Sequence, residues 1–308
     1  MPEFGPVQDN LPPMQFYSTS FAARPLSRIA LGCMSFHDLT TGQAIINTAL
    51  ELGINFFDTA DLYDRGENEK IVGEVLHSRR QDVFIATKVG NRMRPDGSGW
   101  DWVPSKKYIV GAVEDSLRRL KTDYIDLYQL HGGTIEDPWP EIVEAFELLK
   151  ESGKIKGYGI SSIRPNVIRH WAAVSQANTC MTQYSLLDRR PEEATLNHLH
   201  AAGQHVLVRG ALAKGLLAGK PARTYLGMEE GNVKKVQREW ETLAGTDQAG
   251  WAISFALKPP AVGSVVLGTS SVEQLKSAVN SWERVNTQQL DWSSLDEVAP
   301  AQQYTNHR

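Results

Sequence analysis

The sequence is poor in cysteine, since its 308 residues contain only Cys33 and Cys180. Two cysteines are too few for a disulfide framework and lack metal-ligand spacing, so we expect a reducing compartment, the cytoplasm. No apolar run approaches the roughly 20 residues that a membrane span needs. The opening residues, MPEFGPVQDNLPP, lack both the basic and the apolar region of a secretory signal. We therefore expect a soluble globular protein with no membrane partner.

An excess of charge of one sign is also missing. The chain has 32 basic and 36 acidic side chains, a formal net charge of −4, so no global field attracts nucleic acid. The motifs GxGxxG, HExxH and CxxC do not occur. Gly210 and Gly215 have the spacing of a phosphate loop, but Leu216 stands where that loop has its lysine. We expect no nucleic-acid partner and no metal ion.

What the chain has is a large apolar fraction, 41%, arranged in a regular alternation. Eight short apolar runs are typical of buried parallel strands, which read as continuous Val, Ile and Leu segments. The predicted strands are Arg28–Gly32, Asn55–Asp58, Val83–Lys88, Tyr124–His131, Lys156–Gly159, Cys180–Tyr184, His205–Val208 and Val265–Gly268.

Segments with helical periodicity follow the strands. The predicted helices are Thr41–Leu52, Glu67–Ser78, Ser105–Leu120, Pro140–Ser152, Pro165–Ala177, Glu192–Ala202, Ala249–Leu257 and Ser271–Trp282. Gly53, Gly153 and Gly203 each follow a helix and precede an apolar strand, at the position where a helix end favours positive φ.

Eight strand–helix units without an intervening linker predict a (β/α)₈ TIM barrel of the α/β class rather than a doubly wound sheet. We expect a single barrel domain over residues 16–308, preceded by a flexible tail over residues 1–15 that contains several prolines. The polar and charged segment Pro221–Glu241 is expected to be an insertion after the seventh strand.

Ionisable side chains mark the ends of three consecutive predicted strands. Asp58 closes the second strand, Lys88 the third and His131 the fourth, and Tyr63 lies in the loop after Asp58. Catalytic groups of TIM barrels gather at the C-terminal ends of their strands. Each residue alone has an ordinary structural explanation, but four together on one rim predict an active site.

The segments around these residues resemble the aldo-keto reductase superfamily. The similarity begins with GINFFDTADLYDRGENEKIVGEVL, ATKVG and LKTDYIDLYQLHGG, and it continues in order with KGYGISS, QYSLLDRR, LAKGLLAGK and VVLGTSS. It extends over most of the chain, from about Ser27 to Asn280. The resemblance implies a (β/α)₈ barrel that binds a nicotinamide cofactor without a Rossmann domain, which agrees with the missing GxGxxG motif.

Matched position by position, the family's catalytic tetrad falls on Asp58, Tyr63, Lys88 and His131. The resemblance implies an NAD(P)H-dependent reduction of aldehydes or ketones to alcohols, which is reversible. Tyr63 would donate the proton, and Lys88 would stabilise the phenolate and so make the hydroxyl a stronger acid. Asp58 would pair with Lys88. His131 would donate a hydrogen bond to the substrate oxygen and orient the carbonyl.

The resemblance also implies a cofactor groove along the later strands. Ser161 and Ser162 match a Ser-Asn pair that holds the carboxamide, and Tyr184 matches an aromatic residue that stacks on the nicotinamide. Met181 stands where the family has glutamine, and we hypothesise that Gln183 substitutes for it. The complete implied set is Gly32, Cys33, Met34, Asp58, Ser161, Ser162, Gln183, Tyr184, Arg209, Gly210, Ala211, Leu212, Lys214, Gly215, Thr269, Ser270, Ser271 and Gln274.

The cofactor site departs from the family pattern beside the 2′-phosphate, and the substrate pocket is expected to lie in variable loops. Many relatives have an arginine or lysine beside the 2′-phosphate of NADP(H), where this chain has Ser270 and Ser271. NADP(H) is therefore the favoured cofactor and NAD(H) the alternative.

Phe36, Trp100 and Trp102 are expected to line the substrate pocket and to suit a bulky apolar or aromatic aldehyde.

A second function is compatible with the same fold. A cofactor-binding subunit that senses redox state and regulates a partner would keep the barrel and its groove without turnover. Retention of all four tetrad residues favours the enzyme, whose partner is a small-molecule carbonyl substrate. The oligomeric state, the physiological substrate and the direction of the reaction do not follow from these patterns.

Overall fold

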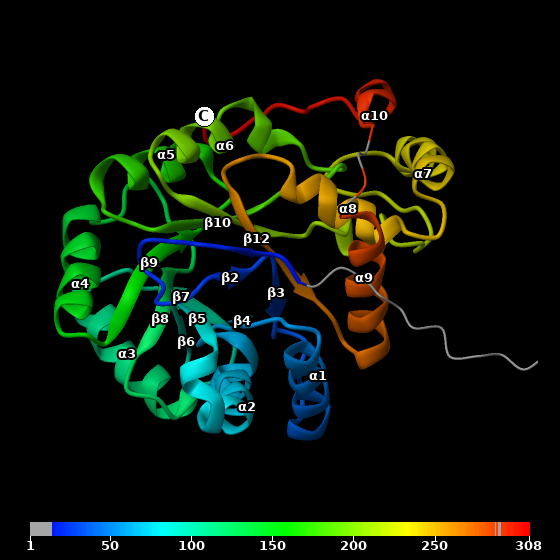
Figure 1. Cartoon of the computed structure of the whole chain (residues 1–308). Coiled ribbons are helices and arrows are strands. Elements are labelled where there is room, and N and C mark those ends of the chain that lie inside the picture. The colour runs from blue at the N-terminus through cyan, green and yellow to red at the C-terminus, as the bar shows by residue number, and fades with distance from the viewer. Residues whose placement is uncertain (1–13, 287, 289–290) are drawn as a thin grey trace, which may run out of the picture.

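Eight parallel strands form the closed barrel that the sequence predicts (Figure 1). The computed structural model describes residues 14–286, 288 and 291–308. Strands β3, β4, β5, β8, β9, β10, β11 and β12 pair in this order, and β12 closes the barrel on β3. They span Ile29–Gly32, Phe56–Asp58, Phe84–Val89, Ile125–Leu130, Ile155–Ser161, Thr179–Gln183, His205–Arg209 and Val262–Gly268. Each coincides with a predicted strand to within a few residues.

Helices surround the barrel and follow its strands, as expected (Figure 1). They are α1 (Leu39–Glu51), α2 (Glu67–Leu76), α3 (Lys106–Leu120), α4 (Trp139–Glu151), α5 (Pro165–Val174), α6 (Thr195–Ala201), α8 (Gln248–Leu257) and α9 (Val272–Val285). The predicted insertion after the seventh strand contains an additional helix, α7 (Glu230–Ala244), and α10 (Ser293–Val298) lies near the C-terminus. Within the described part of the chain, no helix combines the length and the apolar character needed to cross a membrane.

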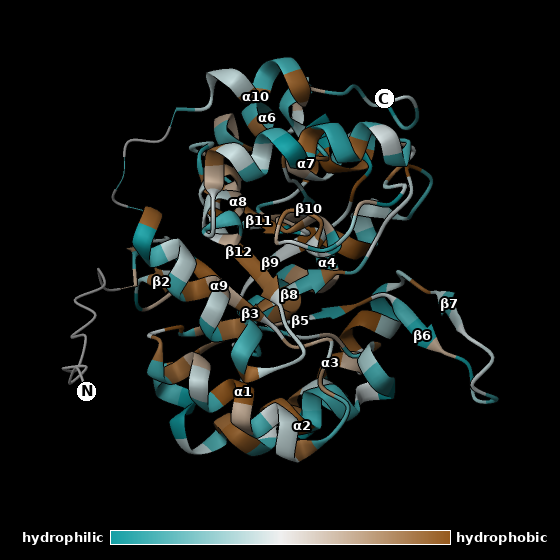
Figure 2. Cartoon of the chain, turned by 90° about the vertical axis from the view of Figure 1, so that its right-hand side faces the viewer, coloured by the Kyte–Doolittle hydropathy of each residue, from teal (hydrophilic) through white to brown (hydrophobic). Residues whose placement is uncertain are grey.

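The alternation of side chains along each strand divides the apolar core into two parts. Phe56, Phe84 and Ala86 point into the barrel, whereas Phe57 and Ile85 pack outward against the helices. Both sets are buried, which explains why the strands read as continuous apolar runs rather than as alternating ones. Figure 2 shows this concentration of apolar residues along the barrel strands.

A short antiparallel hairpin closes one end of the barrel. Strands β1 (Phe16–Tyr17) and β2 (Leu26–Ser27) pair with each other, and Leu26 is fully buried inside the barrel. The Phe21 ring between them packs edge-to-face on Phe84, with 5.8 Å between centroids. Of the tail expected over residues 1–15, residues 1–13 lie outside the described part of the chain. Met14 is buried, with an exposed fraction of 7%.

A second antiparallel ribbon projects from the side of the molecule opposite β2 (Figure 2). Its strands are β6 (Asn91–Met93) and β7 (Trp100–Trp102), and both lie between β5 and α3. The sequence pattern predicts neither ribbon, because three-residue strands are too short to produce a detectable periodicity.

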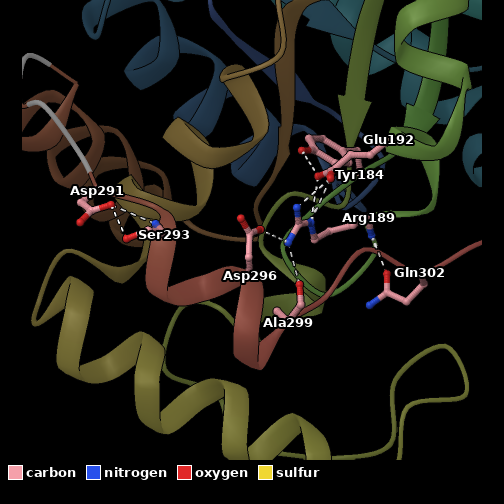
Figure 3. Close-up of polar contacts among 8 residues, drawn as sticks. All are labelled: Tyr184, Arg189, Glu192, Asp291, Ser293, Asp296, Ala299 and Gln302. Atoms are coloured by element: carbon pink, nitrogen blue, oxygen red, sulfur yellow. Dashed lines mark hydrogen bonds and ion pairs between the residues drawn. The ribbon is translucent and has the colours of Figure 1, made fainter.

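The C-terminal segment is fastened to the loop after β10 by Arg189 (Figure 3). The Arg189 guanidinium donates to Asp296 and to the Ala299 carbonyl, at 2.7 and 2.8 Å. The Arg189 backbone N–H donates to Gln302 Oε1 at 2.8 Å. These bonds make the end of the chain part of the wall beside β10.

Close helix packing makes one glycine sensitive to substitution. A Cβ on Gly250 in α8 would lie 2.3 Å from the Ser281 carbonyl oxygen of α9. We expect Gly250→Ala to lower the free energy of unfolding by about 1–3 kcal/mol, because the two helices must separate. Gly111 in α3 has no atom within 4 Å of such a Cβ, so Gly111→Ala should raise it by about 0.5–1 kcal/mol. Urea denaturation measures both; equal effects of the two substitutions would contradict the packing.

Candidate active site

The structure brings Asp58, Tyr63, Lys88 and His131 together at the C-terminal ends of the barrel strands. The Lys88 ammonium donates to Asp58 Oδ2 at 2.6 Å and to the Thr59 carbonyl at 2.7 Å. Its third contact is the Tyr63 hydroxyl, at 3.4 Å. The rings of Tyr63 and His131 meet edge-to-face, with 5.9 Å between their centroids. The four residues therefore form one connected cluster.

Lys88 is fully buried and remains a cation. Burial by itself favours the neutral amine, but Asp58 and the Tyr63 hydroxyl outweigh burial and raise the pKa of Lys88 above its ordinary value. Gln129 also stabilises the Asp58–Lys88 pair, because its Nε2 donates to the other Asp58 oxygen at 3.3 Å. A fixed positive charge thus lies beside the Tyr63 hydroxyl without direct contact with solvent.

His131 is neutral in this setting. Burial lowers its pKa to about 3, and the positive charges of Lys88 and Arg209 act in the same direction. Its Nδ1 is buried and finds no hydrogen-bond partner in the described part of the chain. The Asn91 side chain donates to the His131 backbone carbonyl at 2.9 Å. A neutral imidazole has one N–H, which suffices to donate a hydrogen bond to a substrate oxygen.

A cavity of about 750 Å³ opens in front of this cluster. Asp58, Tyr63 and His131 line it, and Lys88 lies beneath them. Further residues of the expected cofactor and substrate sites that line the cavity are Gly32, Met34, Trp102, Ser161, Ser162, Arg209 and Gly210.

The other residues of the expected sites do not line this cavity, and four of them have surroundings of a different kind. Cys33 and Phe36 are fully buried in the core between barrel and helices. Trp100 is 55% exposed on the projecting ribbon. Tyr184 follows the end of β10 and faces outward, where its ring stacks on Phe255 and its hydroxyl donates to Glu192 at 2.7 Å (Figure 3). The geometry therefore does not support the expected stacking of Tyr184 on the cofactor, since successive side chains of a strand point to opposite faces.

Gln183 and Arg209 lie side by side at the ends of β10 and β11. An Arg209 N–H donates to Gln183 Oε1 at 3.0 Å, and Gln183 Nε2 donates to Asp188 at 2.9 Å. Arg209 thereby presents its charge to the cavity rim while Gln183 holds it. Met181, at the position where the family has glutamine, is buried inside the barrel and also lines the cavity.

The remaining expected cofactor residues lie in the loops after β11 and β12. Ser271 caps the N-terminus of α9, and Gln274 Oε1 accepts hydrogen bonds from the backbone and hydroxyl of Ser270. Ser270 is exposed, whereas Thr269 is buried. In the loop after β11, Ala211 is buried, Leu212 and Gly215 are half-buried, and Lys214 is exposed.

The first of two glycines after His131 makes room for Trp102. The backbone at Gly132 and Gly133 has φ of 141°, a value that favours glycine. A Cβ on Gly132 would lie 3.3 Å from the Trp102 ring. The indole N–H donates to Asp137 at 2.9 Å. Gly132 thus allows the ring to lie at the cavity wall, whereas a Cβ on Gly133 would meet Val167 and Trp139.

Sequence reasoning missed several residues of the cavity wall. Asn91 and Arg164 line the cavity and also hold its frame, since Arg164 donates to the Gly133 carbonyl at 2.9 Å. Both follow barrel strands closely, so the rule that places barrel function at strand ends could have found them. Within the described residues, no group of three or more His, Cys, Asp or Glu side chains could hold a metal ion.

A closed parallel barrel with an acid-base cluster beside a cavity at its strand ends has the architecture of a TIM-barrel enzyme. Comparison with known proteins makes the assignment specific: the family model described as "Aldo/keto reductase family" matches residues 28–300. The chain belongs to this family, whose members are oxidoreductases that use nicotinamide cofactors.

Two similar proteins come from bacilli. "Uncharacterized oxidoreductase YqkF" of Bacillus subtilis is 44% identical over 294 residues, which is 92% of this chain and 96% of that protein. The solved structure of aldo-keto reductase AKR11C1 from Bacillus halodurans in its holo form is also 44% identical, with a TM-score of 0.88. That match covers 96% of this chain and 99% of the other.

A more distant relative carries a more specific name. The "NADH-specific methylglyoxal reductase" of Escherichia coli is 30% identical over 289 residues, which covers 84% of this chain and 88% of that protein. The family therefore includes a relative whose name states NADH.

The buried neutral His131 predicts a pH-dependent stability. Its pKa is about 3 in the folded protein and about 6.5 in an unfolded chain. Between these values the unfolded chain binds a proton that the folded protein does not, so the free energy of unfolding should fall as the pH drops below 6.5. The contribution is at most about 1.4 kcal/mol per pH unit.

We expect His131→Asn to flatten this dependence in urea unfolding measured from pH 4 to 7. His37→Asn, at an exposed position, controls for the loss of an imidazole. An unchanged slope in His131→Asn would contradict a neutral, buried His131.

Proposed function

We propose that this protein reduces the carbonyl group of aldehydes or ketones with a nicotinamide cofactor, and oxidises the alcohols in reverse. The observation that carries the proposal is the contact of the buried Lys88 ammonium with the Tyr63 hydroxyl, beside His131 and at the wall of the main cavity. Carbonyl reduction needs a proton on oxygen, and this cluster is built to move one.

Each residue of the cluster has a role that follows from its contacts. Tyr63 donates the proton to the carbonyl oxygen, and the adjacent Lys88 charge stabilises the phenolate that remains. Asp58 fixes the position of Lys88 through the 2.6 Å ion pair. Neutral His131 donates its single N–H to the same carbonyl oxygen and orients it. The bound cofactor supplies the hydride for the carbonyl carbon.

The cavity rim fits a flat ring with an attached diphosphate. Gly32, Gly210 and Gly268 line the cavity without side chains, and a Cβ on Gly268 would meet no atom within 4 Å. Ser161 and Ser162 offer hydroxyls for an amide, and Arg209 offers a positive charge for phosphate. The loop that carries Lys214 and the N-terminus of α9 continue this surface along the chain.

The resemblance to the family favours NADP(H), with NAD(H) as the alternative. The segment from Thr269 to Gln274 contains no arginine or lysine, and Ser270 is exposed beside Gln274. Neutral side chains can hydrogen-bond to a ribose hydroxyl or to a phosphate, and the name of one relative states NADH. These observations support measurable use of both cofactors.

Trp102 supports a substrate with an apolar or aromatic body. It is the one expected aromatic residue of the substrate pocket that lines the described cavity. Its ring is fixed by the bond to Asp137 and packs closely on Gly132, so it offers a rigid face. Both cysteines are free and buried, and on this usage we place the reaction in the cytoplasm.

Replacement of Tyr63 separates catalysis from cofactor binding. We expect Tyr63→Phe to lower kcat for aromatic aldehydes by about 10²–10⁴-fold, because the proton donor is lost. Affinity for NADPH and NADH, measured by quenching of the fluorescence of the eight tryptophans, should stay within about twofold.

The two measurements also distinguish the alternative function. Tight cofactor binding without turnover of any aldehyde by the wild-type protein would favour a redox-sensing or regulatory subunit. Absence of binding of either nucleotide would contradict both functions. Turnover by Tyr63→Phe at the wild-type rate would exclude Tyr63 as the proton donor.

Cofactor preference should respond to a charge at position 270. We expect Ser270→Arg to increase the affinity for NADPH relative to NADH by about tenfold, because a guanidinium can pair with the 2′-phosphate. Ser270→Gln controls for side-chain size without the charge. An equal change for both nucleotides would show that Ser270 does not face the 2′ position.

A further inference from the structure

A second cavity, of about 590 Å³, lies next to the active site. It is lined by the loop that carries Tyr63, by the projecting ribbon and by the first turns of α3. Leu62 and Asn91 line both this cavity and the main one. The reaction proposed above makes no use of it.

Cations predominate in the second cavity. Arg65, Arg92, Lys107 and Arg119 line it. Within the described part of the chain, Arg65 and Lys107 have no carboxylate within 4.0 Å, and Arg92 has only a distant one, 3.9 Å from Asp101. Arg119 is neutralised by Glu69 at 2.6 Å. Two or three positive charges therefore remain available to a ligand.

The acidic residues of this cavity do not cancel that charge. Asp115 pairs with Arg118 at 2.9 Å. Burial, and after it the nearby Glu69 carboxylate, raises the pKa of Asp61 to about 8, so this carboxyl group carries a proton at neutral pH. Asp61 Oδ1 is buried and has no hydrogen-bond partner among the residues that the structure describes. A protonated carboxyl group beside bound negative charge can donate to it instead of repelling it.

The N-terminus of α3 also favours an anion in this cavity. Ser105 caps this fifteen-residue helix, and Ser105, Lys107 and Tyr108 all line the cavity. The unpaired N–H groups and the positive dipole end of a helix favour negative charge. The side chains of Arg65 and Lys107 thus lie where the backbone already favours an anion.

We propose that this second cavity is an anion-binding site, which takes a phosphate or carboxylate group on Arg65, Arg92 and Lys107. The site goes beyond the carbonyl reduction proposed above, and its occupation does not depend on that reaction. The anion comes either from the far end of a substrate or from a free small molecule. Both sources have the same chemistry at the cavity.

Occupation of this site would act on the active site through two contacts. Leu62 directly precedes Tyr63, and the Asp61 backbone N–H donates to the Lys88 carbonyl at 3.3 Å. On the other side, Asn91 donates to the His131 carbonyl. An anion bound to Arg65 and Arg92 therefore contacts the segments that position both Tyr63 and His131.

Inorganic phosphate, titrated calorimetrically into the full-length protein, tests the site. We expect saturable binding to wild type and a dissociation constant about tenfold or more higher in Lys107→Ala, which loses one charge-assisted contact. Lys106→Ala is the matched control, because Lys106 pairs with Glu144 at 2.5 Å outside the cavity. Arg65→Ala provides a second, independent variant, and urea denaturation verifies that each variant is folded.

Arg209→Ala separates this site from the cofactor groove. Loss of phosphate binding in Arg209→Ala alone would assign the phosphate to the groove and overturn the proposal. Equal phosphate binding to wild type, Lys106→Ala and Lys107→Ala would also overturn the proposal, as would the absence of saturable phosphate binding. Since the titration needs no turnover, its result is independent of whether the protein reduces carbonyls.

Kinetics with benzaldehyde and 4-carboxybenzaldehyde distinguish the two sources of the anion. A rise in KM of about tenfold for 4-carboxybenzaldehyde alone in Lys107→Ala would identify the anion as part of the substrate. A phosphate-dependent change in the rate with both aldehydes, present in wild type and lost in Lys107→Ala, would identify a free anion. Either result supports the site.

Discussion

The candidate active site depends on a lysine ammonium that is buried at the C-terminal end of the barrel. Removing an ammonium from water is costly, so Lys88 needs the Asp58 carboxylate and the Thr59 carbonyl that hold it. Neighbouring parallel strands supply the two charged groups because their C-terminal ends meet at one rim, in the register that pairs Asp58 with Ala86. The same charge helps to keep His131 neutral. One buried cation therefore adds to the effect of burial on the histidine beside it and also faces the Tyr63 hydroxyl.

The barrel could be predicted from sequence because its units repeat one physical pattern. Each strand is buried on both faces, each helix is amphipathic, and eight repetitions make chance agreement improbable. The hairpin of β1 and β2 and the ribbon of β6 and β7 escaped prediction, since two- and three-residue strands carry no period. Their positions are set by tertiary contacts, such as the packing of Phe21 on Phe84.

The candidate site could be predicted in part, because some of its residues lie at the ends of these repeated strands. Asp58, Lys88 and His131 can be identified because they lie at the ends of consecutive strands. A motif does not show whether a side chain just past a strand end points towards the cavity or away from it. Tyr184 illustrates this limit, because one step along the chain turns its ring from the cavity towards Phe255. The unpaired charges of the second cavity escaped for another reason: the loop, the ribbon and the helix that supply them are separated along the sequence and meet only in the fold.

The contacts of Arg189 give the chain terminus a structural role. This one guanidinium joins Glu192 after β10 to Asp296 and Ala299 near the C-terminus (Figure 3). Glu192 in turn accepts a hydrogen bond from the Tyr184 hydroxyl. A chain shortened before residue 296 would leave the Arg189 guanidinium without Asp296 and Ala299, and the Arg189 backbone N–H without Gln302. The segment from Asp296 to Gln302 therefore holds the loop after β10 through several bonds to one residue.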